Sequence, residues 1–300
     1  MGEEAAPPPE QAPADPPKDG EAPENNEETP NEEEEELNPI LDLSNFYIKP
    51  DHFEGNHILD DALEKIEGAP NFRNIPGFPV YGTGQPTEKA MEEIIKHIKK
   101  TDNEKIIWID LRREPVVYIN GSPYAARNPE NIHENVQVTP ANDEEARVLG
   151  KHLARVVTQR SKENEDKSII IHTDKEYNDN PMDRVDVEEK VVVESIKPLD
   201  SIYKNCIETC NVDLQVFRIS MVEDKMPEEE CFDAVIDILK NEPASTPVVF
   251  SCQMGKGRTS LGITIALLVK ELQLTAQLRY ISMQNHKNNL LLLDSWKRWI

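Results

Sequence analysis

One stretch of the sequence combines residue types that could carry out nucleophilic chemistry: residues 248–260, which read VVFSCQMGKGRTS. Cys252 and Arg258 stand six positions apart, with Gly255 and Gly257 between them. An apolar strand before the cysteine and an apolar helix after the arginine would hold a tight turn. The backbone N–H groups of such a turn and the start of the helix attract an anion. A cysteine held there loses its proton more readily than a free one, so the spacing predicts a phosphate-binding loop with a thiol nucleophile.

This stretch has two other interpretations. A nucleotide-binding loop requires Gly-x4-Gly-Lys-Ser/Thr. The sequence does not fit that pattern, because Lys256 is followed by Gly257 and no Gly-Lys-Ser or Gly-Lys-Thr occurs. The remaining alternative is a buried structural Cys252 with Arg258 in a surface ion pair.

The pattern Cys-x5-Arg-Thr between a strand and a helix resembles the signature of the cysteine-dependent protein-tyrosine-phosphatase superfamily. Other stretches resemble the paladin family, in particular the first of its two phosphatase-like repeats, and the wider phytase-like group of inositol polyphosphate phosphatases. These stretches are residues 71–73, 81–86, 110–117, 119–123 and 250–255. The resemblance covers about residues 70–273. It implies a cytoplasmic location, no metal or other cofactor, and a fold like that of dual-specificity phosphatases.

The resemblance also implies a role for each residue of the loop. Cys252 would be the nucleophile that forms a phosphocysteine intermediate. Arg258 would bind two phosphate oxygens, and Thr259 would donate a hydrogen bond to the thiolate. The backbone amides between the cysteine and the arginine would bind the same oxygens: Gln253, Met254, Gly255, Lys256 and Gly257.

A general acid is also required, because an alkoxide leaves slowly without a proton. The expected place is the loop after the strand that precedes the signature, where Glu223 and Asp224 stand shortly before Pro227. The spacing to the proline in the phytase-like group favours Glu223, while residue type in the superfamily favours Asp224, which we prefer. Two solvated carboxylates in an acidic protein are the alternative.

Basic residues indicate the substrate class. Lys256 adds positive charge inside the loop, as in tensin-like lipid phosphatases. Further arginines are candidates for a basic substrate wall: Arg73, Arg112, Arg113 and Arg127. The combination favours an inositol phosphate or a phosphoinositide headgroup over a phosphoprotein.

One residue type departs from the superfamily pattern. Ser251 stands where a histidine that supports the thiolate is usual. Together with the irregular acid loop, this fits a pseudophosphatase that binds phosphate without turnover and serves as a scaffold. The enzyme and the scaffold are therefore both retained as hypotheses.

Strands and helices alternate along the chain, which predicts an α/β fold of the protein-tyrosine-phosphatase-like, dual-specificity type. Its central sheet is expected to be mostly parallel and flanked by helices. Strands are expected at residues 105–111, 168–172, 185–194, 214–219 and directly before Cys252. Helices are expected at residues 60–67, 88–100, 143–160, 199–210, 228–241, 259–272 and 275–285. Residues 110–124 are expected to form a charged loop beyond the carboxyl end of a strand, where ligands bind in α/β folds.

The negative charge is concentrated in residues 1–40, which hold 14 Asp and Glu, one Lys and nine of the 23 prolines. Such a segment buries too little apolar surface to fold, so a disordered acidic tail is predicted. It either binds a protein partner or only increases solubility. Residues 41–300 are assigned to the phosphatase-like domain. The lack of a helix-stop signal near Ile300 suggests that the sequence is truncated there or continues in a longer relative.

Composition excludes some partners. The remainder of the chain has no basic face, which argues against nucleic acid. The longest apolar run, residues 261–269, is too short for a transmembrane segment. Four cysteines, none in metal spacing, fit a reducing cytosol.

Overall fold

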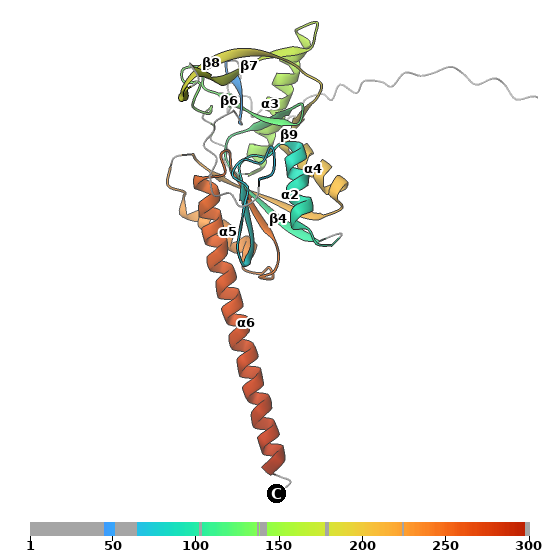
Figure 1. Ribbon diagram of the computed structural model, residues 1–300, viewed down its shortest axis with the longest axis vertical. Coiled ribbons are helices and arrows are strands. Elements are labelled where there is room, and N and C mark those ends of the chain that lie inside the picture. Colours follow the sequence, from blue (N-terminus) through green and yellow to red (C-terminus); the bar gives the residue numbers. More distant parts are fainter. Residues whose placement is uncertain are drawn as a thin grey trace, which may run out of the picture.

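The structure is a computed structural model that describes residues 45–51, 65–101, 104–136, 138, 143–177, 180–223 and 225–297. Three predictions fall on positions outside these ranges: the acidic tail at 1–40, most of the helix expected at 60–67, and the preferred acid Asp224. The described residues form a mixed α/β fold, which confirms the predicted class (Figure 1).

A mostly parallel sheet of five strands forms the centre of the fold. Its strands lie in the order β10 (Asp213–Met221), β4 (Lys105–Arg112), β11 (Val248–Ser251), β3 (Phe78–Thr83) and β2 (Arg73–Ile75). The first four are parallel, and β2 pairs antiparallel with β3. Because the carboxyl ends of parallel strands meet at one edge, this sheet brings together the segments that follow β4, β10 and β11.

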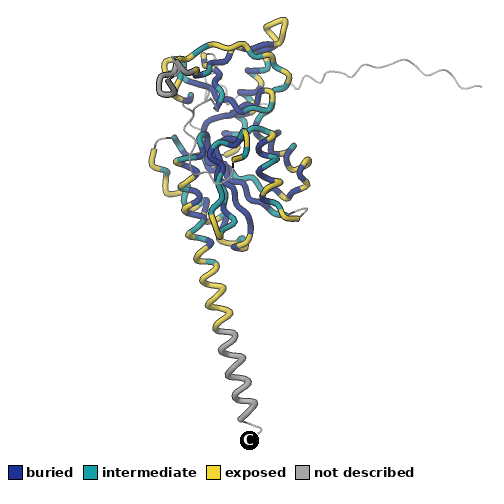
Figure 2. The backbone as a smooth tube through the Cα atoms, in the orientation of Figure 1, coloured by how far each residue is buried: buried dark blue, intermediate teal, exposed yellow. Residues whose placement is uncertain are grey.

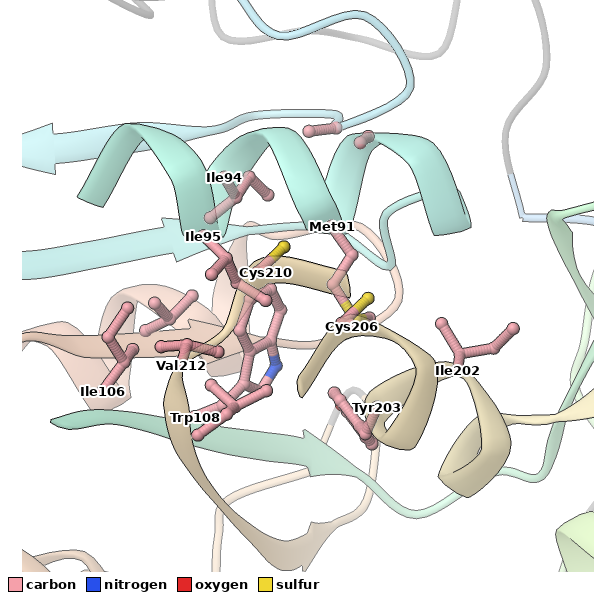
Figure 3. Packing of buried hydrophobic residues seen from close by; sticks show 14 of the residues in the cluster. Met91, Ile94, Ile95, Ile106, Trp108, Ile202, Tyr203, Cys206, Cys210 and Val212 are labelled. Atoms are coloured by element: carbon pink, nitrogen blue, oxygen red, sulfur yellow. The ribbon is translucent and has the colours of Figure 1, made fainter. Parts of the chain in front are cut away.

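Two helices cover one face of the central sheet. They are α2 (Glu88–Ile98) and α4 (Leu199–Cys210), which pack against Trp108 and its neighbours (Figure 3). The predicted start of α2 is confirmed, because the Thr87 hydroxyl accepts a hydrogen bond from Ala90 N at 3.1 Å. Such a cap satisfies an N–H group that the helix itself leaves unpaired.

The other face is covered by α5 (Glu229–Leu239) and the first turns of α6 (Gly257–Lys297). Successive side chains of a strand point to opposite faces. Val249 therefore belongs to the core beneath α2 and α4, whereas Phe250 and Cys252 belong to the core beneath α5 and α6.

A second, antiparallel sheet lies beside the central one and was not predicted from the sequence. Its strands lie in the order β1 (Tyr47–Pro50), β6 (Ser122–Arg127), β5 (Val116–Ile119) and β9 (Ile196–Pro198). The helix α3 (Asp143–Lys162) packs against β5 and β9. The hairpin of β7 (Ser168–Tyr177) and β8 (Asn180–Val192) contacts β1.

The expectation of a charged loop over residues 110–124 was therefore wrong. β4 continues to Arg112, and β5 and β6 form a hairpin whose turn is Asn120-Gly121. Both turn residues have positive φ, 51° and 79°, which is the backbone that an Asn-Gly turn adopts between twisted strands. The second sheet, rather than a loop, thus forms the wall opposite the phosphate loop.

The helix α6 is one continuous helix and not the two predicted at 259–272 and 275–285. Neither glycine nor proline occurs between Gln273 and Thr275, so nothing in the sequence stops the helix there. Its later turns extend away from the domain (Figure 1), and part of this extension is coloured as exposed (Figure 2). Leu272 and Leu278 are largely exposed.

The sequence predicted that no apolar stretch is long enough for a membrane span, and part of α6 differs from this prediction. Within the described residues, Gly257–Ser282 is one helix whose length and composition would allow it to cross a bilayer. Its first turns pack against β3, β11 and α5, as a core helix of a globular domain does.

Candidate active site

The predicted phosphate loop runs from the end of β11 into the first turn of α6. Cys252 is 2% exposed, and its Sγ accepts a hydrogen bond from Thr259 Oγ1 at 3.0 Å. The same hydroxyl lies 3.3 Å from the carbonyl oxygen of Thr83. A hydroxyl has one hydrogen, and an ionised acceptor forms the stronger bond. Ionisation of Cys252 would therefore direct that hydrogen to the sulfur.

The carbonyl groups of the loop are held outward by three donors. Gln85 N donates to Gln253 O at 3.0 Å, Asn71 Nδ2 to Met254 O at 2.7 Å, and Arg73 Nη1 to Gly255 O at 2.7 Å. In a trans peptide the N–H of the next residue points opposite to the carbonyl. The following three N–H groups therefore face the inside of the loop, where such an array binds anions.

Two glycines let the loop approach β3 closely. Gly255 has a φ of 72°, and a Cβ on it would lie 2.3 Å from Gly84 N. A Cβ on Gly84 would lie 2.9 Å from Gln253 O. Glycine at both positions is thus required by the geometry that turns the loop carbonyls outward.

Arg258 closes the loop and is held by a buried carboxylate. Its Nη1 donates to both oxygens of Glu114 at 2.9 Å and to Met221 O at 3.1 Å. Both side chains are at least nine-tenths buried. The alternative of a surface ion pair for Arg258 is wrong, because its ion pair is buried.

The Arg258–Glu114 contact determines the charge state of both groups. Burial works to lower the pKa of Arg258, but the Glu114 carboxylate outweighs burial and raises it. Burial works to raise the pKa of Glu114, but the guanidinium groups of Arg258 and Arg112 outweigh burial and lower it. Both groups are therefore charged near neutral pH.

Of the two candidate acids, the structure describes the position of Glu223. Glu223 follows β10 and lies at the loop, with its Oε1 3.8 Å from Arg258 Nη2. Its Oε2 accepts a hydrogen bond from Asn135 Nδ2 at 2.8 Å. Asp224 lies outside the described residues. The described structure thus places one of the two predicted carboxylates beside the phosphate loop.

The predicted basic wall divides into three kinds of residue. Arg112 is fully buried, and its guanidinium pairs with Asp51, so the expectation that it faces substrate was wrong. Arg73 supports the loop from outside, where it also binds Ser260 Oγ at 3.0 Å. Arg113 and Arg127 line a cavity of about 380 Å³ next to the loop.

This cavity lies between the phosphate loop and the second sheet. Gln253, Met254 and Glu223 line it from the side of the central sheet. Arg127 lies at the end of β6, is 7% exposed, and makes no ion pair within the described part of the chain. Its Nε and that of Arg113 are buried without a hydrogen-bond partner. The cavity therefore presents two guanidinium groups whose Nε atoms are open to a ligand, alongside carboxylates that also line it: Glu114, Glu134, Asp174 and Glu223.

The remaining loop residues take up distinct positions. Lys256 and Met254 are half-buried, and Gly257 is exposed at the start of α6. The Gln253 side chain turns away from the loop, where its Nε2 donates to Asp51 Oδ1 at 3.0 Å.

Sequence reasoning missed the roles of Glu114, Asn135 and Asn71. Glu114 and Asn71 stand in the stretches that carry the family resemblance, but nothing in the sequence alone links them to the loop more than 130 positions later. A carboxylate directly after an apolar strand was an available signal for Glu114. Asn135 carried no signal, because the second sheet that positions it was not predicted.

The fold and the loop define a phosphatase-like domain of the cysteine-dependent protein-tyrosine-phosphatase type. The model of the PTP-like phytase family, described as inositol hexakisphosphate, matches residues 109–270, which is more than half of the chain. The chain therefore belongs to the PTP-like phytase family.

Curated relatives confirm the resemblance to paladin. Paladin from Danio rerio is 28% identical over 254 residues, which cover 75% of this chain and 27% of that protein. Paladin from Gallus gallus is 27% identical over 215 residues, covering 69% and 23%. Paladin from Homo sapiens is 25% identical over 231 residues, covering 72% and 22%. This chain thus spans about a quarter of the length of these relatives.

Solved structures of PTP-like phytases are also similar to this chain. One is a PTP-like phytase from Bdellovibrio bacteriovorus, with a TM-score of 0.46 and 19% identity over 72% of this chain and 65% of that one. Another is the PTP-like myo-inositol phosphatase from Mitsuokella multacida in complex with myo-inositol-(1,3,4,5)-tetrakisphosphate. It has a TM-score of 0.49 and 17% identity over 75% of this chain and 37% of that one.

Proposed function

We propose that this protein is a phosphomonoester hydrolase that acts through a phosphocysteine intermediate. The observation that carries the proposal is the contact of Thr259 Oγ1 with Cys252 Sγ at 3.0 Å, at the base of a loop whose carbonyls are held outward. This arrangement supports a thiolate and places N–H donors where a phosphate group would bind.

The reaction then follows from the positions of the groups. The Cys252 thiolate attacks phosphorus, the bond from phosphorus to the leaving oxygen breaks, and that oxygen takes a proton from the acid. Arg258 and the loop amides stabilise the charge on the other phosphate oxygens. Water then attacks the phosphocysteine and gives a proton to the carboxylate, while Thr259 stabilises the departing thiolate.

Glu223 is our candidate for the acid, with Asp224 as the alternative. Glu223 Oε1 lies 3.8 Å from Arg258 Nη2, so this oxygen is near the groups that would hold the phosphate. A carboxylic acid there is within reach of a leaving oxygen, which is the first requirement of a general acid.

The proposed substrate class is an inositol phosphate or a phosphoinositide headgroup, ahead of phosphotyrosine. Support comes from Arg113 and Arg127 in the adjacent cavity, whose guanidinium groups would meet a second phosphate on the same ligand. Lys256 in the loop adds to this charge. A cytoplasmic location and a protein partner for the acidic tail remain predictions from the sequence.

A catalytically weak, phosphate-binding scaffold is the second candidate. It is favoured by Ser251 in the place of the usual histidine and by the full engagement of Arg258 Nη1 with Glu114 and Met221 O. An anion would have to bind Arg258 through its other nitrogens or displace part of this contact.

The deciding experiment compares the wild type with Cys252→Ser. Phosphate release is measured from inositol hexakisphosphate, a phosphoinositide and a phosphotyrosine peptide, alongside binding of each by calorimetry. The enzyme proposal expects wild-type release at least about a hundredfold above the variant, because the nucleophile is lost. Equal release, with binding retained, would leave only the scaffold.

A further inference from the structure

The side-chain amide of Asn135 touches both the candidate acid and the phosphate loop. Its Nδ2 lies 2.8 Å from Glu223 Oε2 and 2.8 Å from Gln253 Oε1, and 3.5 Å from Glu114 Oε1. Asn135 is 5% exposed, so water does not compete freely for these contacts. One amide group thus lies next to two carboxylates that contact Arg258 and next to Gln253 of the phosphate loop.

All three neighbours are acceptors, which fixes the orientation of this amide. Gln253 presents its Oε1 because its Nε2 is already donating to Asp51. The nitrogen of Asn135 is the only atom of its amide that can donate, so it must be the atom that faces these oxygens. Its two hydrogens serve the two contacts at 2.8 Å, and Glu223 Oε2 receives one of them.

We propose that Asn135 is a positioning residue that fixes the acidic proton of Glu223 on Oε1. A protonated carboxylic acid has one carbonyl oxygen, which accepts, and one hydroxyl oxygen, which donates. Because Asn135 can only donate, the oxygen that it binds must be the carbonyl oxygen. The proton then resides on Oε1, which lies on the side of Arg258. The distance of 3.8 Å to Arg258 Nη2 is too long for a hydrogen bond, so that donor does not compete for Oε1.

This inference rests on the proposed hydrolase function with Glu223 as its acid. When the bond from phosphorus to the leaving oxygen breaks, the electron pair stays on that oxygen and the Oε1 proton moves to it. Glu223 is left as a carboxylate, which accepts the Asn135 hydrogen bond more strongly than the acid did. The same contact therefore stabilises the product of proton transfer.

The backbone around Asn135 is well enough supported for this role. Asn135 pairs with Arg127 across an isolated antiparallel bridge. On one side of it, Val136 N donates to Ala126 O at 3.0 Å, and on the other, Asn128 N donates to Glu134 O at 2.9 Å. The second sheet thus carries Asn135 to the phosphate loop.

The test uses leaving groups of different basicity with the full chain. An alkyl phosphate such as glycerol 2-phosphate needs the acid, whereas p-nitrophenyl phosphate has a leaving group that departs without a proton. Since a general acid contributes about 10²–10⁴-fold, its misplacement in Asn135→Ala is expected to lower the ratio of kcat for the alkyl over the nitrophenyl substrate by about tenfold or more. Asn131→Ala is the matched control, because the hydrogen bonds of its side chain stay within the same exposed turn: Nδ2 donates to Glu134 Oε1, and Oδ1 accepts from His133 N.

A second background separates positioning from structure. In Glu223→Gln, which has no acid, adding Asn135→Ala is expected to change the ratio by less than about twofold, because interacting residues are not additive. Asn135→Ser, which keeps a donor, replaces Asn135→Ala if the alanine variant does not fold. Its kcat ratio is expected to lie between those of the wild type and Asn135→Ala. An equal loss for both substrates, or a further fall in the Glu223→Gln background, overturns the inference. Wild-type release no faster than that of Cys252→Ser would instead overturn the proposed function.

Discussion

Replacing Glu114 with glutamine is predicted to destabilise the domain because it removes the countercharge of Arg258. The two side chains are 8–9% exposed, and Arg258 Nη1 lies 2.9 Å from both carboxylate oxygens. Glu114 also lies 3.6 Å from Arg112 Nε. Asp51 already pairs with Arg112, so the four side chains balance in charge. Glu114→Gln leaves one buried positive charge without a buried countercharge, because the Glu223 carboxylate near Arg258 lies 3.8 Å away and is 38% exposed.

The size of the effect follows from this burial. Removing one partner of a buried ion pair costs about 3–5 kcal/mol, because the other charge stays buried and unpaired. The amide oxygen of glutamine still accepts one hydrogen bond, so we expect about 3 kcal/mol. For a domain of roughly 150–250 residues, this corresponds to a fall in Tm of about 6–12 °C.

The effect has a defined pH dependence. The folded state lowers the pKa of Glu114, so its carboxylate stabilises the fold fully above its unfolded pKa of about 4.3. That contribution is lost as the pH falls through the still lower folded pKa. The difference in unfolding free energy between wild type and Glu114→Gln should therefore be constant near neutral pH and shrink below about pH 4.

Urea unfolding followed by circular dichroism, at pH 7 and at pH 3.5, measures this difference. Inorganic phosphate should reduce the difference in unfolding free energy between wild type and Glu114→Gln at pH 7. A bound anion supplies the charge that the variant lacks and stabilises the folded form by mass action. A loss below about 1 kcal/mol at pH 7, or an equal loss at both pH values, would show that Glu114 does not neutralise Arg258 as argued.

Two further predictions concern the loop and the cavity. Gly255→Ala should abolish phosphate binding in calorimetry, because its Cβ would lie 2.3 Å from Gly84 N, whereas Gly77→Ala, which also has positive φ but open space around it, should keep binding. Arg127→Met should lower the preference for inositol hexakisphosphate over p-nitrophenyl phosphate, expressed as a ratio of kcat/KM, by about tenfold, since a bond to a charged group contributes about 1.5–3 kcal/mol. An unchanged ratio would remove Arg127 from the proposed ligand site.

Local patterns were sufficient to predict the phosphate loop and three strands of the central sheet, β4, β10 and β11, whereas β2 and β3 were not predicted. The apolar run of β4, the cap at Thr87 and the glycine-rich turn after β11 each depend on neighbours in sequence. For this reason the positions of Cys252, Arg258 and Thr259 relative to one another could be predicted before the structure was known.

The second sheet could not be predicted, because its pairing is set by distant segments. β5 is four residues long and pairs with β9, which lies almost 80 positions later. Its residues are apolar, but charged residues around it concealed the strand. Arg112 was placed in the substrate wall for the same reason, since its partner Asp51 lies 61 positions earlier, directly after β1 of the second sheet. Charge alone does not distinguish a buried ion pair from a ligand-binding arginine.

Two departures from the superfamily pattern raised the question of catalytic activity: Ser251 in the place of the usual histidine, and the irregular acid loop. The structure separates them. Ser251 and Cys252 are consecutive, so their side chains face opposite sides of the central sheet. The Ser251 hydroxyl lies on the side of α2 and α4, where it accepts a hydrogen bond from Trp108 Nε1 at 2.9 Å. It is therefore satisfied within the core and fixes the end of β11.

The contact to the sulfur comes instead from Thr259, on the other side of the loop. A histidine in the place of Ser251 would act on the thiolate only through the backbone, whereas Thr259 and Glu223 lie at the reacting side. We infer that turnover depends more on the acid side, formed by Glu223 and Asn135, than on the residue before the cysteine. Loss of activity in Glu223→Gln with activity retained in Ser251→Ala is the result that this argument requires.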